Sequence, residues 1–337
     1  MRKFLRIAKK VVLWTLLAVL VLGGLAATYF INRYDAPGAE NWGLTFSQRQ
    51  AEYLGYDWRT MYLDILNDLH PKNLRLMTYW DDIEKTQGIY DFHETAEMLV
   101  EAGKRNINVI LVVGLKQPRW PECHIPGWAS ALPQTQRDEA QLDMVKNAVT
   151  YYKQFSAVKV WQVENEPMFG FGDGCPQTPA EIIQAEMNIV RAQDNRPILL
   201  TDSGELGRWL PVNKLNPDIF GSTMYRVVEN PKLGYFKYPL PPAFFHLKAG
   251  LVQKFTNTKN IIGVELQAEP WFTSEDVFHT DMDKQNALMN PKIFNEYVDY
   301  AKRVGYKDNY LWGVEWWYWL AHSKGDWGMW DAAKHIL

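Results

Sequence analysis

The chain has 337 residues, a formal net charge of -3 and 47% hydrophobic residues, the composition of a folded globular protein. The near-neutral charge argues against a nucleic-acid-binding protein, because such proteins need a basic face to meet phosphates. Two cysteines are too few for a disulfide-rich scaffold or a cysteine-rich zinc site. Aromatic residues are abundant, with 15 Trp, 17 Tyr and 15 Phe, so we expect some of them to line a site.

The first ten residues form a basic segment without acidic residues: Arg2, Lys3, Arg6, Lys9 and Lys10 are its cations. Residues 11–31 are almost wholly apolar and long enough to cross a bilayer as a helix, which needs about 20 residues. The positive-inside rule then keeps residues 1–10 in the cytoplasm as a basic stub. We predict a transmembrane signal-anchor at 11–31, with the rest of the chain outside the cytoplasm. The small residues at 23–27 also fit a cleaved signal peptide, which would give a secreted protein.

Residues 32–42 are predicted to be a polar linker, and residues 43–337 alternate short β-rich segments with helical patterns. The predicted strands lie at 42–47, 73–80, 107–116, 158–167, 196–205, 218–227, 260–269 and 309–319. The predicted helices lie at 58–69, 93–105, 135–155, 179–193, near 210, 242–255 and 291–304. Eight strand–helix units predict an α/β fold, a (β/α)8 TIM barrel preceded by one transmembrane helix. The main alternative is an open doubly wound sheet. In that fold a glycine-rich phosphate loop usually follows the first strand, and the sequence after 42–47 has no such loop.

Acidic side chains gather where several predicted strands end, which is the functional face of such a barrel. Glu164 and Glu166 end the fourth strand, and Glu265 and Glu269 end the seventh. Further acids fall on the fifth and eighth strands: Asp202, Glu205 and Glu315.

The sequence around these acids resembles the clan A glycoside hydrolases, which include cellulase-like family 5 enzymes and family 42 β-galactosidases. The tripeptide Asn165-Glu166-Pro167 matches the clan's general acid/base at the end of strand 4, and Glu265 matches its nucleophile on strand 7. The segment LRLMTYWDDIEKTQGIYDF at 74–92 resembles the clan's second strand. The resemblance spans residues 43–320.

This resemblance implies retaining hydrolysis of β-glycosidic bonds in an oligo- or polysaccharide by double displacement. Glu166 is then the general acid/base and Glu265 the nucleophile, with their carboxyl groups about 5–5.5 Å apart. Glu269, four residues later, is the alternative nucleophile. Arg75 and Tyr225 are expected to keep the nucleophile ionised, because a cation and a hydrogen-bond donor both favour the charged form.

The resemblance also implies residues that bind the sugar. Asn165 is expected to donate to the 2-hydroxyl of the sugar, a contact that strengthens in the transition state. Trp80, Trp271 and Trp317 fall on strand ends or in the following loops, where indole rings offer flat faces to sugar C–H groups. Each of these tryptophans fits a packing role equally well.

The expected partners are a carbohydrate substrate and, through the N-terminal helix, a membrane. No cofactor or metal is expected, because the seven histidines form no ligand pattern. One alternative is a catalytically inactive carbohydrate-binding barrel at the cell surface, but a degenerate site would usually have lost Glu166 or Glu265. Another is a barrel enzyme of unrelated chemistry, such as a phosphate- or metal-dependent lyase, which needs a ligand cluster that the sequence lacks.

The cysteines Cys123 and Cys175 follow the third and fourth predicted strands. Neighbouring parallel strands place both loops on the same rim of a barrel, and an exported protein lies in an oxidising compartment. We therefore predict a disulfide between them, with two unrelated buried thiols as the alternative.

Overall fold

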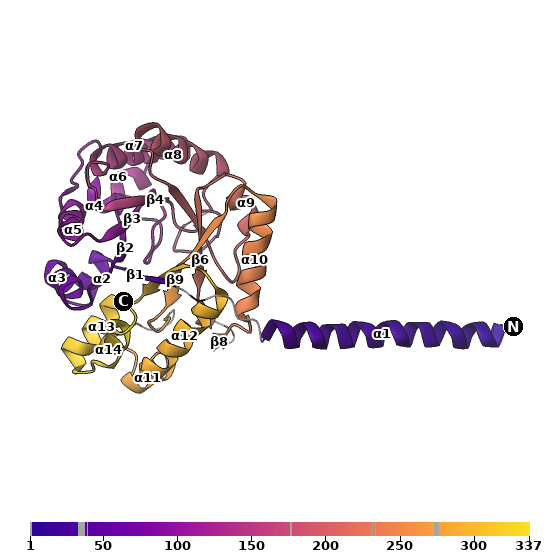
Figure 1. The fold of residues 1–337 in the computed structure, drawn as a ribbon. Coiled ribbons are helices and arrows are strands. Elements are labelled where there is room, and N and C mark those ends of the chain that lie inside the picture. The colour runs from indigo at the N-terminus through magenta and orange to yellow at the C-terminus, as the bar shows by residue number, and fades with distance from the viewer. Residues whose placement is uncertain are drawn as a thin grey trace.

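The computed structural model describes residues 2–32, 38, 40–175, 177–230, 232, 234–272 and 276–337. Within these residues, eight parallel strands form a closed barrel, in the order β1, β2, β3, β4, β5, β6, β9, β10 and back to β1 (Figure 1). The strands are β1 (Asn41–Thr45), β2 (Asn73–Met77), β3 (Asn108–Val113), β4 (Val158–Val163), β5 (Ile198–Asp202), β6 (Ile219–Met224), β9 (Asn260–Gln267) and β10 (Asp308–Trp312). The predicted (β/α)8 barrel is confirmed, and the open-sheet alternative is wrong.

Helices surround the barrel and pack their apolar faces against it. The longer ones are α3 (Trp58–Asp68), α5 (His93–Lys104), α7 (Gln134–Tyr152), α8 (Ala180–Gln193), α10 (Pro242–Phe255) and α12 (Pro291–Val304). Shorter ones are α2 (Gln48–Tyr53), α4 (Trp80–Ile83), α6 (Gly127–Ser130), α9 (Trp209–Asn213), α11 (Met282–Leu288), α13 (Val314–Trp319), the π-helical η1 (Leu320–Lys324) and α14 (Gly328–Lys334). On α7 the buried residues include Met144, Val145, Ala148 and Val149, the three-and-four spacing that places them on one helix face.

The barrel interior is filled by side chains, so it is a packed core and no channel. Ile110, Leu199, Ile262 and Tyr310 form a buried cluster from four strands. Gly43 on β1 makes room for the Tyr310 ring, because a Cβ added at this glycine would lie 2.6 Å from a ring carbon.

Several predicted strands end earlier in the structure. β10 stops at Trp312, where Gly313 adopts φ 130°, and residues 314–319 form α13. Glu315 therefore lies in the first turn of a helix, which corrects its predicted place on a strand. A β-hairpin, β7 (Val227–Asn230) with β8 (Gly234–Lys237), follows β6 and was not predicted.

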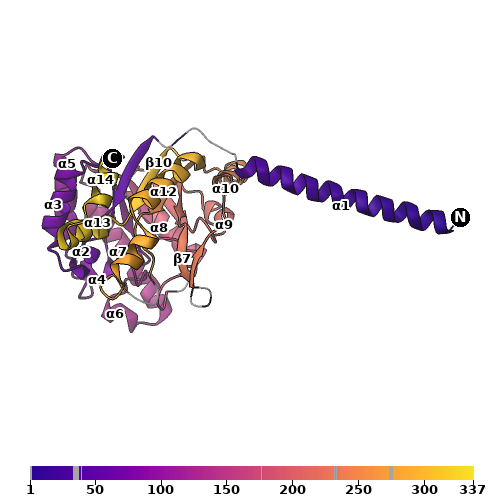
Figure 2. The ribbon, with the colours of Figure 1, turned by 90° about the horizontal axis from the view of Figure 1, so that it is seen from below.

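The N-terminal helix α1 (Arg2–Asn32) extends away from the barrel in both views (Figures 1 and 2). Its segment Lys9–Tyr29 is long and apolar enough to span a bilayer, and none of that segment is buried against the protein. Such a helix fits an anchor or a signal sequence. Most of the predicted linker at 32–42 lies between the end of α1 at Asn32 and the start of β1 at Asn41. Residues 33–37 and 39 lie outside the described residues.

The predicted disulfide is confirmed. Cys123 and Cys175 are bonded, with their Cα atoms 5.3 Å apart, and the bond joins the loop after β3 to the loop after β4. This cross-link ties together two neighbouring loops at the carboxyl-terminal face of the barrel.

Replacing both cysteines by serine should lower the free energy of unfolding by about 4 kcal/mol. The bond closes a loop with a sequence separation of 52, and losing it restores chain entropy to the unfolded state. Denaturant titration of the wild type and of C123S/C175S measures the difference. Equal stabilities would contradict a structural role for the bond.

Candidate active site

The backbone at the end of β4 turns sharply to present two acids. Glu164 and Glu166 both have positive φ angles, 59° and 46°, which are strained for residues with a side chain. Hydrogen bonds hold this conformation. The Glu164 carboxyl accepts from the backbone N–H groups of Leu115 at 2.8 Å and Lys116 at 2.6 Å, and the Glu166 N–H donates to the Thr201 hydroxyl at 2.8 Å. The strand end is thus fixed to its two neighbouring strands.

Glu265 on β9 receives a hydrogen bond at each carboxyl oxygen. Arg75 Nη1 donates to Oε1 at 2.6 Å, and the Tyr225 hydroxyl donates to Oε2 at 2.8 Å. Arg75 has no exposed surface and also donates to Gln162 Oε1 and Asn165 Oδ1, both at 2.8 Å. The structure therefore brings together Glu265, Arg75, Tyr225 and Asn165, which the sequence predicted to share a site.

Glu166 lies in a different electrostatic environment. Its carboxyl receives no hydrogen bond from a cation among the described contacts, and the residue is 7% exposed. Burial and the nearby negative charge of Glu265 raise the pKa of Glu166 well above its ordinary value. Glu166 and Glu265 are thus close enough to interact, and Glu166 holds its proton at a pH where an ordinary carboxyl group is ionised.

Glu122, in the loop after β3, adds a carboxyl group that the sequence analysis missed. Its Oε2 accepts from Asn165 Nδ2 at 3.3 Å, and the residue is 8% exposed. Burial raises its pKa to about 8, against the opposing effect of Lys116. The sequence signal was weak, because Glu122 follows no strand directly; its position beside Cys123 was the one indication that its loop reaches the rim.

Glu269 and Glu315 lie in a separate ion cluster. Arg119, from the loop after β3, binds Glu269 at 2.5 Å and Glu315 at 2.7 Å, and its guanidinium lies 4.1 Å from the ring centroid of Trp312. Glu315 has no exposed side-chain surface. Glu269, the alternative nucleophile, is thus engaged with Arg119, whereas Glu265 is the acid bound by Arg75 and Tyr225.

A row of aromatic rings leads outward from Tyr225. Trp271 packs edge-on against Tyr225 with ring centroids 4.8 Å apart, and its other neighbour is Phe171 at 5.7 Å. Phe171 in turn meets Trp120 at 6.1 Å, and Trp120 is 65% exposed. The row therefore connects the solvent to the side chain that binds Glu265.

Trp80 and Trp317 are buried, which favours the packing alternative for these two residues. Neither has any exposed surface. The Trp80 indole donates to Glu84 at 2.7 Å, and the Trp317 indole donates to the Ala268 carbonyl at 2.7 Å. Both rings are packing residues, and much of the tryptophan excess fills the core rather than a site.

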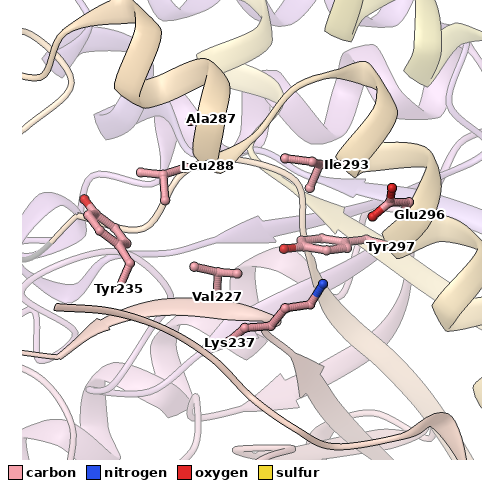
Figure 3. A pocket seen from close by; sticks show the side chains of 8 residues that line it. All are labelled: Val227, Tyr235, Lys237, Ala287, Leu288, Ile293, Glu296 and Tyr297. Carbon is pink, nitrogen blue, oxygen red and sulfur yellow. The ribbon is translucent and has the colours of Figure 1, made fainter. Parts of the chain in front are cut away.

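A cavity of about 320 Å³ lies elsewhere, between the β7–β8 hairpin and helices α11 and α12 (Figure 3). Its lining includes Val227, Tyr235, Lys237 and Tyr297, and none of the predicted site residues. Among the described residues, no three His, Cys, Asp or Glu side chains converge as a metal site.

No protein-family model matches the sequence, and a search of curated proteins finds no significant match. Solved structures do match. Xylanase 10B from Thermotoga petrophila RKU-1, in complex with xylobiose, aligns with a TM-score of 0.55 and 18% identity over 85% of this chain and 83% of its own. A GH5_18 protein from Streptomyces cattleya, in complex with GlcNAc, gives 0.56 and 11% over 82% and 71%. An exo-β-1,4-mannosidase from Opitutaceae bacterium strain TAV5 gives 0.53 and 16% over 83% and 53%. At these identities the comparisons show a shared barrel fold.

Substituting Glu265 by glutamine should lower the pKa of Glu166. The negative charge of Glu265 is one cause of the raised pKa, so its removal makes ionisation of Glu166 easier while burial still opposes it. Carboxyl ¹³C chemical shifts followed against pH measure this pKa, and the loss of one resonance in E166Q assigns it. The control is E97Q, which removes the charge of an exposed ion pair on α5 and should leave the pKa of Glu166 unchanged. An unchanged pKa of Glu166 in E265Q would contradict the coupling between Glu166 and Glu265.

Proposed function

We propose that the protein is a retaining β-glycosidase in which Glu265 is the nucleophile and Glu166 the general acid/base. The observation that carries this proposal is the contrast between the two acids. Glu265 accepts from Arg75 and Tyr225, as a carboxylate does, while burial and the charge of Glu265 favour the protonated form of Glu166. Double displacement needs this division of protonation at the start of the reaction.

In the first step, Glu265 attacks the anomeric carbon and the bond to the leaving oxygen breaks. Glu166 gives its proton to that oxygen, so the leaving group departs as a neutral alcohol. A covalent glycosyl-enzyme ester on Glu265 results. Its formation removes the negative charge of Glu265, which lowers the pKa of Glu166 and suits it to its next role as a base.

In the second step, the Glu166 carboxylate takes a proton from water, and the water oxygen attacks the anomeric carbon. The ester bond breaks, Glu265 regains its charge, and the sugar leaves with its original anomeric configuration. Arg75 and Tyr225 keep the nucleophile in place through both steps. Asn165, held by Arg75, is proposed to turn its amide N–H toward the 2-hydroxyl of the sugar, and Trp271 to contact the sugar ring.

We also propose that the barrel works outside the cytoplasm, anchored by α1 or released from it. The uncovered apolar helix and the Cys123–Cys175 disulfide support this location, since disulfides persist in oxidising compartments. Carbohydrate polymers and glycans in that space are the class of substrate that such an enzyme would meet.

The variant E265A should have no hydrolytic activity on aryl β-glycosides, because no group remains to form the covalent intermediate. Added azide should restore turnover by entering the space left by the side chain, and the product should be the glycosyl azide of inverted configuration. Product analysis by NMR identifies it. Full activity in E265A would refute the assignment, and E97A is the control for a remote glutamate.

The loss of hydrolytic activity in the variant E166A should depend on the leaving group of the substrate. Substrates that need protonation of the leaving oxygen should lose activity by about 10²–10⁴-fold, the usual contribution of general acid catalysis. Aryl glycosides with very acidic phenols should lose far less in the bond-breaking step. Rates measured for a series of leaving groups give the dependence of the rate on leaving-group pKa. Equal losses for all leaving groups would argue against an acid role for Glu166.

A further inference from the structure

The ion cluster around Arg119 crosses one side of the barrel mouth. Arg119 belongs to the loop after β3, whereas Glu269 follows β9 and Glu315 follows β10. In the closed barrel, β2 and β1 lie between β3 and β10. The Arg119 side chain therefore reaches over the ends of β1 and β2 to the far loops.

Hydrogen bonds from the loops beneath complete this barrier. Ser47, after β1, donates its N–H to Glu315 Oε1 at 2.5 Å, and its hydroxyl pairs with the Tyr79 hydroxyl at 2.8 Å. Tyr79, after β2, donates to the Pro118 carbonyl at 3.1 Å. We name Arg119, Glu269, Glu315, Ser47 and Tyr79 the polar wall.

The polar wall is rigid for an electrostatic reason. Ser47, Tyr79 and Glu315 have no exposed surface, and the side chains of Arg119 and Glu269 are 11% and 13% exposed. Separating ion partners at such depth leaves buried charges unpaired, which is strongly unfavourable. A substrate therefore does not pass through the wall by displacing it.

Aromatic rings extend from the loop after β3 to the loop after β4 and on to the loop after β9. Trp120 follows Arg119 in the chain but contacts Phe171, in the loop after β4. Glu166 also follows β4, so the proposed acid and Phe171 follow the same strand, and the exposed ring of Trp120 packs against Phe171. A general acid protonates the leaving oxygen, and the leaving group therefore lies on the Glu166 side, toward the rings.

We propose that the enzyme releases single sugars from non-reducing ends, in a pocket that the polar wall closes beyond the terminal sugar. This inference rests on the proposed glycosidase function and specifies its mode of action. Cleavage within a chain needs sugar units on both sides of the broken bond, and in this proposal the paired charges of Arg119, Glu269 and Glu315 occupy the space beyond the bound sugar. The leaving portion of the substrate extends over Phe171 and Trp120, the outer rings of the row, whose faces suit sugar C–H groups.

The test compares 4-nitrophenyl β-monosides with the matching β-biosides, using the full chain in detergent. Glucosides, galactosides, mannosides and xylosides are each assayed. We expect immediate nitrophenol release from an accepted monoside. From the bioside we expect the free monosaccharide first and nitrophenol only after a lag, or no cleavage if that linkage is not accepted. Release of intact disaccharide in the first turnovers would overturn the proposal. No turnover of any substrate would instead contradict the glycosidase function itself.

The variant R119A/E269A tests the polar wall directly. Removing both side chains opens the far end of the pocket, so the ratio of disaccharide to monosaccharide released from the bioside should rise at least tenfold. R59A/E97A, which removes an ion pair that is more than a third exposed, is the matched control and should keep the wild-type ratio. A folded R119A/E269A variant with an unchanged ratio would show that the wall does not set the mode of action. If circular dichroism shows that this variant is unfolded, the wild-type product order still decides the proposal.

Discussion

The site depends on one buried positive charge. Arg75 has no exposed surface, so every hydrogen bond that its guanidinium makes must come from within the barrel. It reaches Gln162 and Asn165 beside β4 and Glu265 on β9, and thereby fixes the relative positions of three strand ends. The two proposed catalytic acids lie on two of these strand ends. Arg75 therefore helps to position the two acids, and its positive charge offsets part of their negative charge.

A second pair of acids supports the strained turn at the end of β4. Gln141 on α7 donates to Glu164 and to Glu186 on α8, at 2.8 Å each. Burial raises the pKa of both carboxyl groups, most strongly that of Glu186, while Glu164 accepts two backbone N–H groups from the β3 loop. The hydrogen bond between the two carboxyl groups raises the pKa of Glu186 and lowers that of Glu164, so the protonated form is favoured more at Glu186. The outer helices thus hold the strand end from which Glu166 projects.

The strands and the central polar residues could be predicted because they follow periodic rules. Buried parallel strands are continuous apolar segments, and residues at their carboxyl ends converge, so the strand-end acids could be placed on one face from order alone. Arg75 and Tyr225 could be placed beside Glu265 from the resemblance to clan A. Glu122 and Arg119 could not, because loop conformation determines where their side chains point. The aromatic composition of segment 314–319 suits a strand. In the structure β10 ends before Gly313, and the tryptophans of 314–319 lie on helix α13.

The disulfide has a consequence for how the mouth of the barrel is held together. Cys123 lies next to Glu122 and four residues after Arg119, and Cys175 lies four residues after Phe171. The bond therefore joins the loop that carries Arg119 and Trp120 to the loop that carries Phe171. Without this bond, only noncovalent contacts hold these two loops together. Forming this bond needs an oxidant, so the covalent link between the two loops depends on the redox state of the surroundings.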